Sequence, residues 1–237
     1  MRIAAAQFPS VPGDIAANVR SMAGLVREAA ARGARFVAFC ELAAHGYALE
    51  PITADPGSWL TEDDPRLEPV REACRETGTA ALVGCAARTD GDRPAITALV
   101  IGPDGELLTR YDKRHLYGRE SEVFTAGAAE GRFTVDGVRF AVAVCYDNRF
   151  PELARSAAAD GCTVYAASSV LVEGNDSFET VYPVRARENG LYVLVANQVG
   201  PADPGHCPGG SAVWSPDGAR VASAGAQAPG LAVVELP

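Results

Sequence analysis

A cysteine at the end of an apolar strand gives the clearest chemical signal in the sequence. The segment RFAVAVCYDNRFPEL covers residues 139–153, and its strand-like run ends at Cys145 before a polar turn leads to Pro151 at a helix start. A thiol there lies at the exposed carboxyl end of a strand, and backbone N–H groups of the next turn point to where an oxyanion would form. The layout is that of a nucleophile elbow, although a free cysteine is more often only a small buried hydrophobe.

Glu41 follows a second apolar strand. In RFVAFCELAAHGY, residues 35–47, this carboxylate comes directly after a buried run, where desolvation would raise its pKa toward values useful in proton transfer. The sequence therefore makes Glu41 a candidate general base. A carboxylate that only caps or pairs within a loop has the same pattern.

Lys113 comes just after a third strand, in TRYDKRHLYGRESEVF at residues 109–124. Such a charge-rich turn is most often solvated. A lysine that instead pointed into a cleft would donate to a developing oxyanion and would lower the pKa of a nearby thiol. Spacing alone leaves both interpretations of Lys113 open.

Helical and strand-like patterns alternate along the chain and form the framework for these residues. Short turns containing Asp-Gly separate three pairs of strands, which indicates hairpins. Alternation implies layers and hairpins imply mixed sheets, so the patterns predict an α/β sandwich in one domain, residues 1–237, rather than a uniformly parallel barrel. The expected strands are 2–8, 36–39, 80–86, 96–101, 107–111, 133–135, 139–144, 163–167, 192–196, 212–215, 219–222 and 231–235, and the expected helices are 14–32, 66–77, 151–159 and 178–189.

Composition excludes several classes of protein. The formal charge is −9, from 21 Lys and Arg against 30 Asp and Glu, which argues against a surface that attracts nucleic acid or anionic lipid. The apolar runs are of strand length, and the N-terminus has no signal-peptide pattern. We therefore expect a cytoplasmic protein that binds neither nucleic acid nor membrane.

The six cysteines are expected to be reduced thiols. A chain of this size without a signal peptide does not need disulfides for stability. No CxxC pair occurs, and the histidines are only His45, His115 and His206, so the sequence gives little support to a metal site.

The three strand-end segments resemble the nitrilase superfamily of carbon-nitrogen hydrolases, whose members carry Glu, Lys and Cys at three strand ends. FCELAAHGY resembles the family's glutamate block at Glu41, YDKRHLYG its lysine block at Lys113, and VCYDNRFPELAR its cysteine block at Cys145. The blocks stand in family order, and the later segments 185–200 and 209–218 are also similar to the family.

This resemblance implies a four-layer αββα fold, homodimers that pack through helical faces, and a reaction without metal or organic cofactor. It implies that Cys145 is the nucleophile, Glu41 the general base and Lys113 the oxyanion stabiliser. The expected reaction is hydrolysis of a small carboxamide to carboxylate and ammonia through a thioester acyl-enzyme. The CYDNRFPEL block looks more like amidase branches, including omega-amidases, than like nitrilases, so an omega-amidase-like enzyme is expected. An N-carbamoyl amide (ureide) hydrolase or a nitrilase of the same superfamily is the alternative.

A second glutamate is expected near the site. ESEVFTAG, residues 120–127, resembles the family segment that carries it, and Glu120 matches best. Glu122 is the alternative alignment. The resemblance implies that this carboxylate orients the substrate or Lys113.

Tyr146, Tyr47 and Arg149 complete the predicted substrate-binding residues. The Tyr146 backbone N–H would be a second oxyanion donor, and the other two are pocket residues by position. Arg149 would pair a substrate carboxylate. Its alternative role is a salt bridge to Glu152 or a helix cap.

Two rival functions stay open at this point. A papain-like pair would use Cys145 with His45, His115 or His206, whereas a serine triad lacks a GxSxG motif. A protein of another class would keep the fold as a catalytically silent scaffold for partner contacts.

Overall fold

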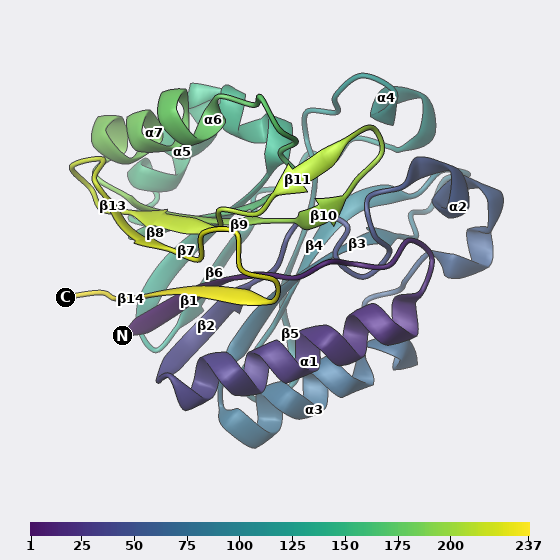
Figure 1. Cartoon of the computed structure of the whole chain (residues 1–237), viewed down its shortest axis with the longest axis horizontal. Helices are drawn as coiled ribbons and strands as arrows, with labels where there is room; N and C mark the ends of the chain where they lie inside the picture. The colour runs from purple at the N-terminus through teal and green to yellow at the C-terminus, as the bar shows by residue number, and fades with distance from the viewer.

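Two six-stranded sheets form the centre of the protein in the computed structural model, which describes residues 1–237 (Figure 1). In both sheets three adjacent strands are parallel to one another, and every other pair of neighbouring strands is antiparallel. The first sheet has the order β14 (Gly230–Glu235), β1 (Arg2–Gln7), β2 (Ala34–Ala38), β3 (Ala80–Ala87), β4 (Ala95–Ile101) and β5 (Leu107–Asp112). The second has the order β13 (Arg220–Ser223), β12 (Ala212–Trp214), β9 (Tyr192–Asn197), β8 (Val164–Ser169), β7 (Val138–Val144) and β6 (Arg132–Val135).

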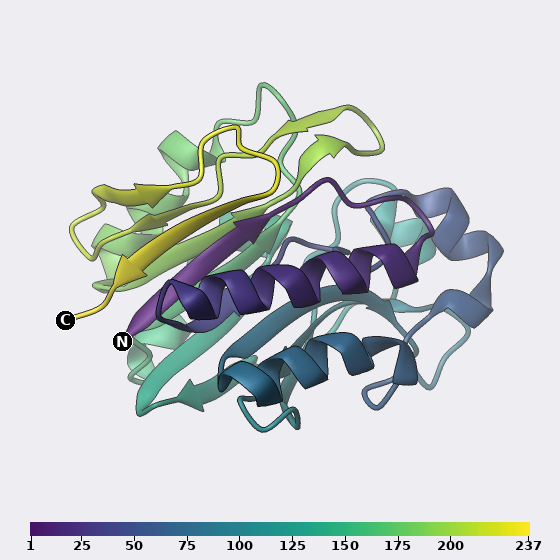
Figure 2. The ribbon, with the colours of Figure 1, turned by 60° about the horizontal axis from the view of Figure 1, so that its bottom comes forward.

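Helices cover the outer face of each sheet. On the first sheet lie α1 (Ile15–Ala31) and α3 (Glu68–Thr77), which Figure 2 brings to the front. On the second sheet lie α5 (Pro151–Ala159), α6 (Ser177–Thr180) and α7 (Tyr182–Asn189). The predicted four-layer αββα sandwich is therefore confirmed. None of the helices combines the length and the hydropathy of a membrane span. The shorter helices are α2 (Leu49–Ala54), α4 (Glu120–Val123) and the 3₁₀ turns Pro56–Ser58, Pro65–Leu67 and Cys145–Arg149.

The largest apolar core lies between the two sheets. Phe36 of β2 packs against Phe133 and Phe140 of the other sheet, with ring centroids 5.4 Å and 4.7 Å away. Two further apolar clusters lie between each sheet and its helices. Because both faces of each sheet are covered, the central strands read as nearly unbroken apolar runs, as β3 does.

Local sequence signals predicted the strands of both six-stranded sheets and the longer helices, whereas α2, α4 and the 3₁₀ turns at 56–58 and 145–149 were not predicted. Asp14 caps α1 as expected, since its side chain accepts a hydrogen bond from the Ala17 N–H at 2.9 Å. The expected helix 178–189 is broken at Val181, because Pro183 has no N–H to bond to the preceding turn and its ring would clash there. The helix expected from residue 66 begins with a 3₁₀ turn, and the hairpin of β10 (Val199–Pro201) and β11 (His206–Pro208) was not predicted.

Three strand ends meet at one edge of the sandwich. β2 and β5 run in the same direction, because β2 is parallel to β3 and the next two pairings are both antiparallel. The second sheet is attached at the same edge, where the Ser168 hydroxyl at the end of β8 donates to the Phe39 carbonyl oxygen at 2.9 Å. β7 is parallel to β8, so its carboxyl end reaches this edge too. The fold thus brings Glu41, Lys113 and Cys145 to one place.

Candidate active site

A buried ion pair lies beside the strand-end cysteine. The Lys113 Nζ donates to Glu41 Oε1 at 2.6 Å, and neither side chain is exposed to solvent. The Cys145 thiol is near enough to Glu41 for each group to affect the pKa of the other. The structure therefore brings together all three residues for which the sequence predicted catalytic roles.

Cys145 has a backbone conformation that is rare for a residue with a side chain. Its φ is +46°, at the point where β7 ends and the 3₁₀ turn Cys145–Arg149 begins. Leu42, directly after Glu41, has φ +51°. Left-handed backbone at non-glycine residues costs about 1–2 kcal/mol and is concentrated at functional sites. The two sharp turns aim Glu41 and Cys145 out of the ends of their strands.

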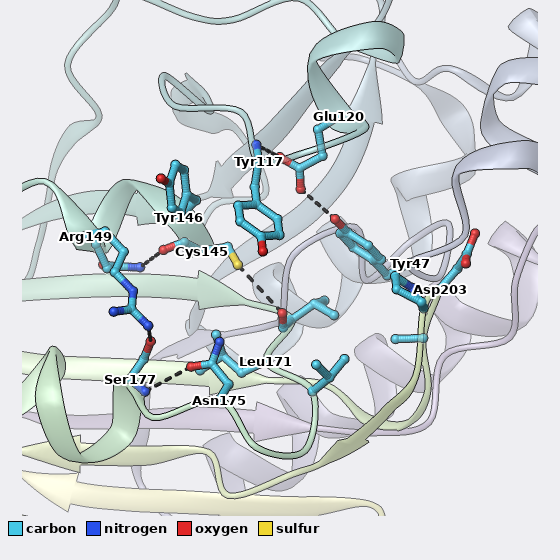
Figure 3. Close-up of a pocket in the computed structure, with 15 residues that line it drawn as sticks. Tyr47, Tyr117, Glu120, Cys145, Tyr146, Arg149, Leu171, Asn175, Ser177 and Asp203 are labelled. Atoms are coloured by element: carbon cyan, nitrogen blue, oxygen red, sulfur yellow. Dashed lines mark hydrogen bonds between the residues drawn. The ribbon is translucent and has the colours of Figure 1, made fainter.

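Glu120 is the second carboxylate on Lys113. It accepts from Lys113 Nζ at 2.8 Å, from the Tyr47 hydroxyl at 2.6 Å and from the Tyr117 N–H at 2.7 Å (Figure 3). Glu122, the alternative in the sequence, is exposed on α4. Tyr47 and Glu120 thus form one hydrogen-bonded group with Lys113, and both lie near Cys145, where the sequence placed them.

Burial and charge shift the pKa values of the three central groups. Burial raises the pKa of Glu41 to about 7, against the opposing effect of Lys113, and the charge of Glu120 raises it further. Burial, followed by the charge of Glu41, raises the pKa of Cys145 well above its usual range, while Lys113 opposes the rise. The pKa of Lys113 is also raised, because the two carboxylates outweigh its burial. The raised pKa favours the neutral thiol of Cys145, and a neutral thiol needs a base to become a nucleophile.

Asp147 holds the turn that carries Cys145. This fully buried carboxylate accepts from the Tyr111 hydroxyl at 2.7 Å, the His115 N–H at 2.9 Å and the Val144 N–H at 3.1 Å, and His115 Nδ1 lies 2.9 Å from it. Since Tyr111 and His115 flank Lys113 in the chain, Asp147 links the Lys113 segment to the Cys145 turn.

Arg185 and Asn148 hold the same turn from the other side. Arg185, which is buried on α7, donates to the backbone oxygens of Asn148 and Arg149 at 2.9 Å and 3.2 Å. The Asn148 side chain donates to the Cys145 carbonyl oxygen at 2.7 Å. Asp147, Asn148 and Arg185 were not predicted from the sequence. Only the polar run that follows Cys145 hinted at a turn that needs buried partners.

A pocket of about 560 Å³ opens above Cys145. Its volume is in the range of small-molecule sites. Tyr47, Glu120, Tyr146 and Arg149, the four predicted substrate-binding residues, all line it. The other lining residues are Tyr117, Cys145, Asn148, Val170, Leu171, Val172, Asn175, Ser177, Ala202, Asp203 and Pro204.

Arg149 has a different partner from the one considered in the sequence. Its Nη2 donates to Asp176 Oδ1 at 2.7 Å and to the Ser177 hydroxyl at 3.2 Å, and no ion pair joins it to Glu152. Figure 3 shows Arg149 directed at Ser177 and away from the Cys145 sulfur. Tyr146 packs its ring 5.1 Å from that of Tyr117 at the pocket rim.

The three histidines do not pair with Cys145. His45 accepts from the Ala86 N–H through Nδ1 and pairs with the Ser58 carbonyl oxygen through Nε2, and burial lowers its pKa to about 4. His115 stacks on Phe150, with centroids 3.6 Å apart, and bonds to Asp147. His206 is exposed on β11. None of them is hydrogen-bonded to Cys145, so the geometry gives no support to a Cys–His pair.

Comparison with known proteins defines the class. The family model for carbon-nitrogen hydrolases matches residues 2–237, and the chain belongs to this family, within the nitrilase superfamily. It is accordingly a hydrolase of carbon–nitrogen bonds other than peptide bonds, of the amidase type.

Particular relatives agree with this assignment. The omega-amidase NIT2 of Xenopus tropicalis is 30% identical over 226 residues, which cover 89% of this chain and 79% of the relative. The structure of an amidase from Nesterenkonia sp. has a TM-score of 0.91 at 31% identity, over 100% of this chain and 90% of that one. A variant of the amidase from Nesterenkonia sp. AN1, with 30% identity and a TM-score of 0.91 over 100% of this chain and 93% of that one, carries the result of Michael addition of acrylamide at its active-site cysteine.

Proposed function

We propose that this protein hydrolyses a small carboxamide to a carboxylate and ammonia, with Cys145 as nucleophile, Glu41 as general base and Lys113 as oxyanion stabiliser. The observation that carries the proposal is the buried Lys113–Glu41 pair beside a strand-end thiol that lines a pocket. The amidase and omega-amidase relatives support a carboxamide as substrate. A ureide hydrolase or a nitrilase is the alternative within the superfamily.

The first half of the reaction forms an acyl-enzyme. Glu41 takes the thiol proton of Cys145 as the sulfur attacks the amide carbonyl carbon, which gives a tetrahedral oxyanion. An ammonium group has three N–H donors. The Lys113 Nζ lies 2.6 Å from Glu41 Oε1, 2.8 Å from Glu120 Oε1 and 2.7 Å from Glu120 Oε2, so in this proposal one N–H turns from Glu120 to the oxyanion. The Tyr146 N–H, in the first turn of a helix where N–H groups lack helical partners, is the second donor.

Collapse of this intermediate releases ammonia and leaves a thioester on Cys145. The protonated Glu41 supplies the proton that the leaving nitrogen takes up. In the second half, Glu41 removes a proton from a water molecule, whose oxygen attacks the thioester carbonyl. The carbon–sulfur bond breaks, the carboxylate product leaves, and the proton on Glu41 returns to the sulfur. A carboxyl with a pKa near neutrality suits both the acceptance and the donation of this proton.

The proposal extends to the chain as a whole. We propose that residues 1–237 act as one carbon-nitrogen hydrolase domain, because the site takes Glu41 and Lys113 from one sheet and Cys145 from the other. Homodimerisation through the helical faces stays a prediction from the family resemblance.

Product analysis with a mixed library tests this function. The protein is incubated with matched carboxamides, nitriles and N-carbamoyl amines, and ammonia, carboxylate and amine are measured. We expect carboxylate and ammonia in equal amounts from the carboxamides. Turnover of the nitriles or carbamoyl compounds alone would contradict the amidase proposal.

A further requirement of the site is the absence of a side chain at residue 84. A Cβ on Gly84 would lie 2.2 Å from the Cys40 carbonyl oxygen and 2.8 Å from the Leu42 nitrogen, so Gly84→Ala must displace the turn that carries Glu41. A misplacement of about 1 Å costs on the order of a hundredfold in rate, so we expect a loss of that size in kcat/KM. The overpacked β3 should also lose about 1–3 kcal/mol of unfolding free energy.

The matched control for this substitution is Gly24→Ala on α1. No atom lies within 4 Å of a Cβ placed there, so kcat/KM should be unchanged and the helix slightly more stable. Steady-state kinetics and thermal unfolding of both variants make the comparison. Wild-type kcat/KM in Gly84→Ala would mean that the turn does not depend on this close approach.

A further inference from the structure

The charges around the pocket bear on which amides it accepts. Two cationic side chains lie at or beside the pocket: Arg149 lines it, and Lys113 is buried next to the Cys145 thiol. An acyl chain that ends in a carboxylate would need one of them as a partner, because a charge taken out of water is costly unless it is paired.

Lys113 cannot form an ion pair with a substrate carboxylate. It is fully buried and already bonded to Glu41 Oε1 and Glu120 Oε1, so the local balance is two carboxylates to one ammonium. In the proposed reaction, one of its N–H groups turns from Glu120 to the carbonyl oxygen. A second carboxylate in this region would be repelled by both glutamates.

Arg149 is occupied as well. The side chain is held by Asp176 and Ser177, and the Asn175 side-chain oxygen accepts from the Ser177 N–H at 2.9 Å, which fixes the loop (Figure 3). The Arg149–Asp176 pair is partly exposed and contributes little to stability. It nevertheless matters for binding, because an incoming carboxylate must displace Asp176 or share the guanidinium with it.

The rest of the pocket has apolar walls and one unpaired anion. Val170, Leu171 and Val172 form a continuous apolar segment of the lining, and the Tyr117 ring, which is 63% exposed, stands at the rim. Asp203, also in the lining, is exposed; its carboxylate has no side-chain hydrogen bond or ion pair, and Figure 3 shows it directed away from the Cys145 sulfur. Two carboxylates, Glu120 and Asp203, thus line the pocket against one cation, Arg149. Behind the lining, Glu41 pairs with Lys113 and Asp176 with Arg149.

We propose, on the basis of the proposed function, that this pocket selects amides with an uncharged, apolar acyl group and rejects amides whose acyl chain carries a carboxylate. Asp176 sets the selection by neutralising Arg149, and the exposed Asp203 adds only a weaker, solvent-screened repulsion at the rim. Arg149 is then a positioning residue for the loop of Asn175 and Ser177, rather than the receptor for a substrate carboxylate that the sequence suggested.

Three amides of nearly equal size test the charge preference. Butyramide, succinamate and 4-aminobutyramide differ at the far end of the acyl chain, which is neutral, anionic or cationic. We expect kcat/KM for butyramide to exceed that for succinamate at least tenfold, with 4-aminobutyramide in between. Succinamate turnover equal to or faster than that of butyramide overturns the proposal. So does equal rejection of both charged amides, because polarity alone would then explain it.

Two variants locate the effect. In Asp176→Asn, Arg149 is released, and we expect the ratio of succinamate to butyramide kcat/KM to rise about fivefold or more. Glu28→Gln removes a charge from the exposed face of α1 and should leave the ratio unchanged. A ratio that is the same in wild type and Asp176→Asn, or that rises equally in Glu28→Gln, overturns the role of Asp176.

A binding measurement separates this inference from the proposed chemistry. Ligand-observed NMR titrations of the Cys145→Ala variant compare butyramide and succinamate without any turnover. Tighter binding of butyramide supports the charge selection even if no amide is hydrolysed. Binding of succinamate at an equal or lower concentration, or binding of neither, counts against it.

Discussion

Replacement of Cys145 by alanine is expected to lower kcat/KM for amide hydrolysis by at least about 10⁴-fold, because the acyl-enzyme then cannot form. Cys145→Ser should be almost as inactive. A hydroxyl is a far weaker acid than a thiol, and Glu41, with a pKa raised to about 7, is too weak a base to ionise it. Initial rates of ammonia release, with mass spectrometry for an acyl adduct on the protein, measure the effect.

Cys162→Ala provides the matched control for the loss of a thiol. Cys162 lies in the apolar layer between the second sheet and its helices, remote from the pocket lining, so its removal should cost stability but not turnover. Thermal unfolding of all three variants checks that they fold. Amide hydrolysis by a folded Cys145→Ala variant at the wild-type rate would refute the nucleophile assignment.

The layered fold could be predicted from the sequence because the signals that define it are local. Apolar runs, Asp-Gly turns and the Asp14 cap each act over a few residues, and all three hairpins formed as expected. The β10–β11 hairpin was missed because its short strands, in a segment rich in Gly and Pro, carry no apolar alternation. The helix break at Val181 was missed because apolar spacing continues through Pro183, although the proline itself was the available warning.

Prediction of the site depended on strand ends more than on the residues themselves. Glu41, Lys113 and Cys145 each follow a strand, and the parallel relation of β2 to β5 and of β7 to β8 brings those ends to one edge. Each residue alone fitted a structural role at least as well as a catalytic one, and the family resemblance decided between the two.

The supporting residues could not be found this way, because their partners are distant in the chain. Asp147 receives the Tyr111 hydroxyl from 36 positions away, and Arg185 reaches the Asn148 carbonyl oxygen from 37 positions away. Arg149 was likewise placed at the pocket, but its pairing with Asp176 depends on how α6 packs against the cysteine turn. Such contacts are set by packing of the layers, to which a single sequence gives no direct signal.

Glu41→Gln is expected to lower kcat/KM by about 10²–10⁴-fold, the usual contribution of a general base. The amide keeps the size of the carboxylate and can still accept from Lys113 Nζ through its oxygen, so the buried contact is retained. What is lost is the ability to take the thiol proton, which Cys145 holds firmly because its pKa is raised well above the usual range. Glu122→Gln, on the exposed face of α4, is the matched control and should be fully active.

The pH dependence of the wild type gives an independent check on this role. Below its pKa of about 7, Glu41 is protonated and cannot act as a base, so kcat/KM should fall about tenfold per pH unit on the acid side. The ionisation of Glu41 does not cause such a fall by destabilising the fold at acid pH. A carboxyl whose folded pKa lies above its ordinary value of 4.5 contributes most to stability below pH 4.5 and loses its contribution as the pH rises through the folded pKa. The residual activity of Glu41→Gln should lack the acid limb, and an unchanged limb would assign it to another group.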